Sequence, residues 1–121
     1  MITVFGIKTC STCRSALKWL AAEGIPARFH DFRAEGLAAK DLDAWIDACG
    51  WEGVLNRKGT TWKKLPASDT ANLDKLRARA LMLQHPTLIK RPVFDLGQSG
   101  VNAIVIGFKE PEQEKIRAAL S

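Results

Sequence analysis

The first twenty residues contain a short apolar run and, after it, apolar residues at helical spacing. Ile2–Phe5 is apolar and is followed by a glycine and a short polar stretch. Beyond it, Ala16, Leu17 and Leu20 recur at helical spacing and share one face. The pattern predicts a strand, a turn and a helix, with Cys10–Cys13 at the turn where the helix begins.

A second strand is predicted soon after this helix. Gly24 has the position of a helix C-cap, and Pro26 just beyond it cannot continue the helix. Ala27–Phe32 then has the pattern of a strand, and we interpret His30 and Asp31 as ordinary strand residues rather than a proton relay. Strand, helix and strand of these lengths form a βαβ unit, so we expect parallel strands and a right-handed crossover.

The middle of the chain, about residues 34–89, has no convincing strand pattern. Lys40–Cys49 and Leu73–Leu83 have apolar residues at helical spacing. Between them, Trp51–Pro66 reads as an irregular, basic linker that contains glycine. We expect this part to be a helical insertion or a surface for a partner.

The last third returns to strand patterns. Pro92–Leu96 and Asn102–Ile106 flank the turn residues 97–100, which predicts an antiparallel hairpin, and Glu112–Leu120 predicts a closing helix. The order of elements is typical of an α/β fold of thioredoxin-like (glutaredoxin-like) type. We therefore expect a four-stranded mixed sheet with the helical insertion after the second strand, in a single domain over residues 1–121.

The composition is that of a globular protein, with 46% hydrophobic and 26% charged residues among 121. No apolar run approaches the ~18 residues of a membrane span. The N-terminus also lacks the residue order of a signal peptide. We expect a cytoplasmic protein that is a monomer and has no membrane partner.

The net charge of +5 raises the question of nucleic-acid binding. The basic residues are dispersed, and no recognisable nucleic-acid-binding module is present. We therefore expect no direct contact with nucleic acid. An anionic substrate or an acidic protein partner accounts for the charge as well as nucleic acid does, and we interpret most of the basic residues as a solvated surface.

The two cysteines at the first turn form a CxxC motif, a pattern typical of redox proteins. Backbone N–H groups and the positive end of the helix dipole stabilise a thiolate at Cys10, and Arg14 adds a positive charge nearby. We expect Cys10 to be a reactive nucleophile. Cys13 is either a resolving thiol that closes a disulfide with Cys10 or a small apolar residue of the helix.

A zinc site is the first alternative for these cysteines, and the sequence disfavours it. A structural zinc ion requires four ligands, usually from two closely spaced pairs. The remaining candidates, Cys49, His30 and His85, are widely separated along the chain. We expect no metal site and interpret Cys49 as a buried small hydrophobe.

Two arginines could recognise an anion. Arg57 lies in the basic linker, and Arg91 immediately precedes Pro92 at a predicted strand start. The guanidinium group recognises a tetrahedral oxyanion or a carboxylate through two parallel hydrogen bonds, although each arginine could equally be surface charge. The X–Pro bond at Pro92 is a candidate for the cis form.

Five segments together carry a resemblance to a known family. They are GIKTCSTCR near the start, FHDFRAEG, WEGVLNRKGTTWKKL, LMLQHPTLIKRPV and, late in the chain, VIGFKEPE. On these segments the chain resembles the ArsC/Spx family, and especially its short YffB-type members. The resemblance covers nearly the whole chain and implies an ArsC-like thioredoxin-fold domain with a helical insertion after the second strand.

The resemblance also implies roles for individual residues. In arsenate reductases of this family the nucleophilic cysteine falls on Cys10. It attacks arsenate, and glutathione then releases a mixed thiol–arsenic species for reduction through glutaredoxin. Two of the oxyanion-binding arginines fall on Arg57 and Arg91, and the cis-proline falls on Pro92.

The sequence departs from arsenate reductases at two positions. Their third arginine should lie near GFKEPE, where Lys109 stands, and a lysine does not reproduce the guanidinium fork. Those reductases carry serine at the position of Cys13, whereas Spx regulators carry CxxC. YffB-type proteins resemble glutathione-dependent thiol reductases.

The leading hypothesis is therefore a thiol-dependent oxidoreductase with glutathione as co-substrate, glutaredoxin as a candidate partner and no bound cofactor. The residues assigned to the site are catalytic Cys10 and Cys13, with Lys8, Arg14, Arg57, Arg91, Pro92 and Lys109 for binding substrate or glutathione. The alternative is a Spx-like, redox-switched transcriptional regulator that binds RNA polymerase through its α-subunit. Arsenate reduction itself is the third hypothesis.

Overall fold

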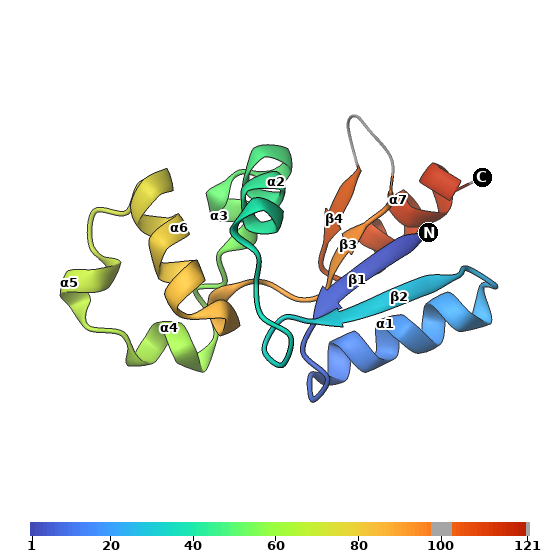
Figure 1. Ribbon diagram of the computed structural model, residues 1–121, viewed down its shortest axis with the longest axis horizontal. Helices are drawn as coiled ribbons and strands as arrows, with labels where there is room; N and C mark the ends of the chain where they lie inside the picture. The colour runs from blue at the N-terminus through green and yellow to red at the C-terminus, as the bar shows by residue number, and fades with distance from the viewer. Residues whose placement is uncertain (98–102, 121) are drawn as a thin grey trace. The chain divides into compact units, whose positions relative to one another are not determined.

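The computed structural model describes residues 1–97 and 103–120. Its strands are β1 (Ile2–Gly6), β2 (Ala27–Asp31), β3 (Val93–Asp95) and β4 (Ile104–Ile106). Its helices are α1 (Ser11–Ala22), α2 (Ala39–Cys49), α3 (Trp51–Val54), α4 (Thr60–Lys64), α5 (Ala67–Thr70), α6 (Lys75–Gln84), the 3₁₀-helix η1 (Pro86–Leu88) and α7 (Glu110–Leu120), as Figure 1 shows.

The chain divides into two compact units. The sheet unit comprises Met1–Gly36 and the chain from Arg91 onward, and the helical unit comprises Leu37–Lys90. The insertion predicted over about 34–89 corresponds to the helical unit. Whether the two units fold as one domain over 1–121 stays a prediction.

The sheet unit contains a mixed sheet of four strands in the order β2-β1-β3-β4. β1 pairs in parallel with β2, with Ile2 opposite Ala27, and antiparallel with β3, with Val4 opposite Phe94. β3 and β4 are antiparallel. The predicted mixed sheet, βαβ unit and hairpin strands are thus confirmed, whereas the predicted hairpin residues 98–102 lie outside the described residues.

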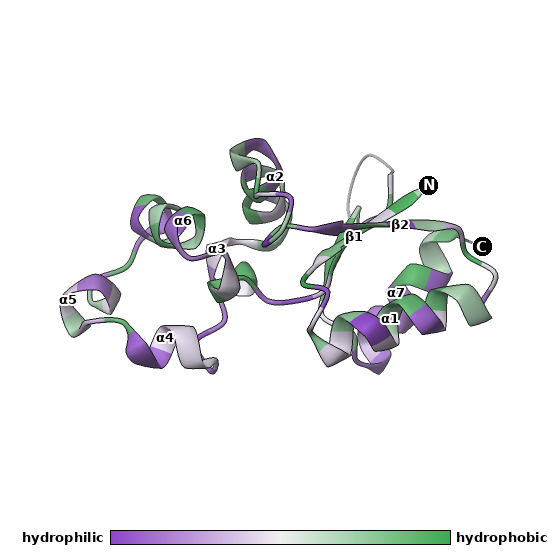
Figure 2. Cartoon of the chain, turned by 60° about the horizontal axis from the view of Figure 1, so that its bottom comes forward, coloured by the Kyte–Doolittle hydropathy of each residue, from purple (hydrophilic) through white to green (hydrophobic). Residues whose placement is uncertain are grey.

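Two helices cover one face of this sheet. α1 and α7 lie on the same side of the strands in Figure 2, and both alternate apolar and polar residues. Because successive strand residues point to opposite faces, alternate positions of the strands contribute to a core that the helices complete. This core contains Ile2, Val4, Ala16, Leu20, Phe94, Leu96, Val105 and Ile116. The buried stripe of α1 also includes Cys13.

The helical unit has its own buried residues. Leu42, Trp45 and Ile46 are buried on α2, as their spacing indicates, and α6 buries Ala78, Leu81 and Met82. Arg79 on α6 donates from Nε to Asp43 Oδ1 on α2 over 2.6 Å, so the two helices are also joined by an ion pair.

Part of the sequence interpretation of this unit is wrong. The segment Trp51–Pro66 was expected to be irregular, but it contains the short helices α3 and α4. α6 begins at Lys75 rather than at Leu73, because Asp74 Oδ1 accepts the Arg77 backbone N–H over 2.9 Å and caps the helix.

Candidate functional site

The turn between β1 and α1 presents Cys10 directly before the helix. The Cys10 N–H donates to the Ile7 carbonyl over 2.9 Å and closes the turn. The Arg14 N–H then donates to the Cys10 carbonyl over 3.1 Å, which is the first helical hydrogen bond. The first N–H groups of a helix have no partner within it, so they are available to the Cys10 sulfur.

The surroundings of Cys10 favour its thiolate. Burial acts to raise the pKa of the Cys10 thiol, but hydrogen bonds from the Cys13 backbone N–H and thiol, from Arg91 and from the Thr12 N–H outweigh it. The pKa of Cys10 therefore lies below its ordinary value of 9.0. A lowered pKa increases the fraction of thiolate at a given pH, and the thiolate is the nucleophilic form.

Cys13 has the opposite character. It is fully buried on α1, and burial together with the hydrogen bond to Cys10 and the charge of Cys10 raises the pKa of Cys13 to about 11. All three cysteines of the chain are free thiols in the structure. The two thiols of the CxxC motif are therefore unequal, because the pKa of Cys10 is lowered and the pKa of Cys13 is raised.

Gly6 at the end of β1 makes room for the Cys13 side chain. A Cβ atom at Gly6 would overlap the Cys13 Sγ, so only glycine lets the strand and the helix approach this closely. The sequence marks Gly6 as a turn residue, but its role in seating the second cysteine depends on tertiary contact.

Asp31 at the end of β2 fixes the same turn, and sequence reasoning missed this role. One oxygen of its carboxylate accepts the Lys8 N–H over 2.9 Å, and the other accepts the N–H groups of Arg33 and Ala34 over 2.9 and 3.1 Å. The Lys8 N–H is the main cause that holds the pKa of Asp31 below its ordinary value. The only local signal is an aspartate followed by a turn, which is common at loop starts.

Arg91 and Pro92 lie at the start of β3. The Arg91 side chain hydrogen-bonds to Cys10, and its charge lowers the pKa of Cys13 against the effect of burial. The Arg91–Pro92 peptide bond is cis, as expected from the sequence. The Pro92 carbonyl accepts the Gly107 N–H over 2.9 Å next to β4.

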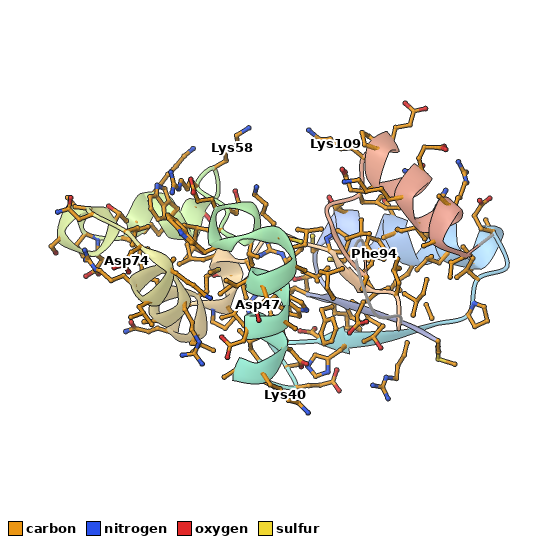
Figure 3. The ribbon with its side chains drawn as sticks, turned by 90° about the horizontal axis from the view of Figure 1, so that it is seen from above. Lys40, Asp47, Lys58, Asp74, Phe94 and Lys109 are labelled. Atoms are coloured by element: carbon orange, nitrogen blue, oxygen red, sulfur yellow. The ribbon has the colours of Figure 1, made fainter. Side chains whose placement is uncertain are left out.

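The remaining predicted residues occupy different places. Lys8 and Arg14 are exposed beside the Cys10 turn. Lys109 is exposed, its backbone N–H donates to Glu112 Oε1 over 2.8 Å, and its side chain extends outward from the start of α7 (Figure 3). Arg57 belongs to the helical unit. Within the sheet unit, the structure brings together Cys10, Cys13 and Arg91.

In the helical unit, Arg57 is exposed between α3 and α4. Its guanidinium lies over the ring of Trp51 at 5.4 Å and over the ring of Trp62 at 5.8 Å from the centroids. These distances are typical of cation–π contacts.

Metal sites and membrane-spanning helices are both absent from the described residues. No group of three or more His, Cys, Asp or Glu side chains within residues 1–97 and 103–120 is arranged to hold a metal ion. The helices of the described part are too short or too polar to cross a membrane.

Comparison with known proteins places this arrangement among its relatives. A model of the ArsC family matches residues 5–116. The solved structure of a protein named YFFB is 39% identical, with a TM-score of 0.88 and 100% of both chains covered. An arsenate reductase (ArsC) related protein from Brucella melitensis is 42% identical, with a TM-score of 0.73 over 93% of this chain and 91% of its own.

A more distant relative is a regulator. The global transcriptional regulator Spx of Streptococcus pneumoniae is 28% identical, over 99% of this chain and 86% of its own. These likenesses establish the predicted thioredoxin-like fold for the whole chain.

Proposed function

Since the chain belongs to the ArsC family, we propose that it is a thiol-dependent oxidoreductase in which Cys10 is the nucleophile and glutathione the co-substrate. The observation that supports this most is the lowered pKa of Cys10 beside Arg91. A structural cysteine has no need of a stabilised thiolate, whereas a nucleophile does.

The proposed first step reduces an oxidised substrate, for instance a mixed disulfide between glutathione and another thiol. The Cys10 thiolate attacks the glutathione sulfur, the disulfide bond breaks, and the substrate leaves as a thiolate that takes a proton from water. Cys10 now carries glutathione in a mixed disulfide. Arg91 stabilises the thiolate before attack, and it is one of the two arginines to which we assign the carboxylates of glutathione.

The second step regenerates the enzyme. A second glutathione thiolate attacks the mixed disulfide, glutathione disulfide leaves, and the Cys10 thiolate returns. In sum, the mixed disulfide and one free glutathione become the substrate thiol and glutathione disulfide, so one glutathione thiol is oxidised for each substrate thiol released. In the alternative route, Cys13 loses its proton and attacks the Cys10 sulfur of the mixed disulfide, glutathione leaves as a thiolate, and a Cys10–Cys13 disulfide forms; burial of Cys13, which raises its pKa, acts against this route.

The proposal is tested by the pH dependence of Cys10 alkylation and by glutathione-dependent reduction of a mixed disulfide. We expect Cys10→Ser to abolish turnover, and Arg91→Ala to raise the pH at which Cys10 becomes reactive. Arg57→Ala should weaken glutathione binding. If Cys10→Ser kept its activity, or if the pH profile matched that of a free cysteine, the proposal would be wrong. Arsenate, the substrate of the third hypothesis, is assayed in parallel with the mixed disulfide.

The CxxC motif and the similarity to Spx support a second candidate, a regulator that binds the α-subunit of RNA polymerase. In this case formation of a Cys10–Cys13 disulfide would be the switch. A pull-down with the C-terminal domain of the α-subunit, under oxidising and reducing conditions, distinguishes the two. Retention of the domain only by the oxidised protein would favour the regulator.

A further inference from the structure

The exposed loop between α3 and α4 is fixed on both sides of Arg57. The Asn56 N–H donates to the Leu88 carbonyl over 2.7 Å, next to an isolated antiparallel bridge between Leu55 and Ile89. The Asn56 side chain in turn accepts the Lys58 N–H over 3.0 Å. The backbone that carries Arg57 is therefore held even though its side chain is exposed.

Two indole rings then orient the side chain. The guanidinium lies within 6 Å of the centroids of both Trp51 and Trp62. A cation–π contact is an attraction between the charge of the guanidinium and the faces of the rings, so it uses none of the N–H groups as donors to an oxygen. The rings therefore restrict the arginine without occupying its hydrogen-bond donors.

Arg117, which also lies over a tryptophan ring, differs from Arg57 in its hydrogen bonds. Arg117 lies 5.2 Å from the ring centroid of Trp19, but its guanidinium also donates to Glu23 and Glu114 over 2.7 and 3.0 Å. Within the described part of the chain, no hydrogen bond or ion pair engages the Arg57 guanidinium. Arg117 donates to two carboxylates of its own chain, whereas Arg57 lies over two rings and no carboxylate of the described residues engages it.

The charge around Arg57 also suits an anion. Lys58, Lys63 and Lys64 are exposed in the same segment, and the Lys58 side chain extends outward from the helical unit in Figure 3. One acidic residue, Glu52 on α3, is exposed next to Trp51. The local balance is therefore positive.

We propose that Trp51 and Trp62 are positioning residues that hold the Arg57 guanidinium ready to bind a carboxylate of glutathione. The inference rests on the proposed function for the identity of the ligand. It adds that affinity for glutathione depends on two aromatic rings of the helical unit. Pre-orientation lowers the entropy lost when the ligand is bound.

The test uses the full-length Cys10→Ser protein and S-methylglutathione, which cannot react. Trp51→Leu and Trp62→Leu should each weaken binding roughly two- to five-fold, the change expected for losing one exposed cation–π contact. Trp51→Phe and Trp62→Phe should restore most of the affinity, because a phenyl ring still offers a π face. Trp19→Leu, at the arginine that already donates to two carboxylates, is the matched control and should bind as the parent protein does.

In the protein with Cys10 intact, the leucine variants should raise KM for glutathione by the same factor and leave kcat unchanged. Equal binding and equal KM in the leucine variants would overturn the inference. So would undiminished binding of the dimethyl ester of S-methylglutathione, which lacks both carboxylates. Thermal unfolding of each variant shows whether a loss of binding reflects a loss of fold.

A free oxyanion presents the same pair of oxygens to a guanidinium as a carboxylate does. Sulfate is therefore titrated in parallel, and tryptophan-dependent binding of sulfate that is tighter than that of S-methylglutathione would overturn the carboxylate assignment. Tryptophan-dependent binding of S-methylglutathione by a protein without reductase activity would support the inference and refute the proposed function. A failure of the inference about the tryptophans can thus be distinguished from a failure of the proposed reductase function.

Discussion

In the sheet unit Cys10 lies on a turn fixed by backbone hydrogen bonds, beside a fully buried Cys13 and above a close-packed core. In the helical unit Arg57 is exposed and is oriented by two ring faces. A nucleophilic thiolate gains from fixed N–H donors, because they lower its pKa against the opposing effect of burial. An anion-binding arginine gains from exposed donors in a fixed plane, because the ligand itself completes the site.

The largest expected effect concerns the two cores. Phe94 is fully buried in the sheet unit and Leu42 in the helical unit. Phe94→Ala should cost about 3–5 kcal/mol and Leu42→Ala about 2–5 kcal/mol of the free energy of unfolding. If the chain is one domain, as the sequence predicts, either variant lowers the midpoint of a single denaturant transition followed by both CD and fluorescence. Two separate transitions, each moved by only one variant, would contradict the single domain.

A second prediction concerns the contact between Gly6 and Cys13. Gly6→Ala should destabilise the protein by about 1–3 kcal/mol, the usual cost of overpacking, because the new Cβ overlaps the Cys13 Sγ. The double variant Gly6→Ala, Cys13→Ala removes the clashing sulfur and should recover most of the loss in urea denaturation. A double variant as unstable as the single one would show that the contact is not the cause.

The strands of the sheet unit could be predicted because apolar runs, a glycine C-cap and a hairpin pattern each mark them locally. The short helices α3, α4 and α5 could not, since four or five residues are too few for a helical repeat. The segment that contains α5 also depends on a distant residue. Arg77 on α6 donates to the carbonyls of Ser68, Ala71 and Asn72, and no local pattern indicates this.

The site divides in the same way. The CxxC motif before a helix predicts the reactivity of Cys10 from local sequence. The importance of Arg57 and Arg91 came only from the family resemblance, because an isolated arginine is usually surface charge. The roles of Gly6 and Asp31 depend on the register that places them opposite each other on β1 and β2, which the sequence does not fix.

The inequality of the two thiols leads to a pH prediction of intermediate size. Cys13→Ala removes a hydrogen bond that lowers the pKa of Cys10. The pH at which the alkylation rate of Cys10 reaches half of its maximum should therefore be higher than in the parent protein. The folded-state pKa of Cys13, about 11, lies above its ordinary value of 9.0. Between these values the unfolded thiol ionises first, so Cys13 makes the stability fall as the pH rises, and this fall should be shallower in Cys13→Ala than in the parent protein.

The smallest effect is expected at Asp31, because its carboxylate is near the surface. Its folded-state pKa lies below the ordinary value of 3.8, so its contribution to stability is present above that pH and is lost as the pH falls through the folded pKa. Asp31→Asn should therefore flatten the acid limb of the stability curve. It should also loosen the Cys10 turn, since the asparagine amide group cannot accept the Lys8 N–H if its oxygen faces Arg33 and Ala34.

Urea denaturation at several pH values, with Asp43→Asn on the helical unit as the matched control, checks both effects. An Asp31→Asn curve parallel to that of the parent protein, together with an unchanged alkylation rate of Cys10, would show that the turn is held by its backbone alone.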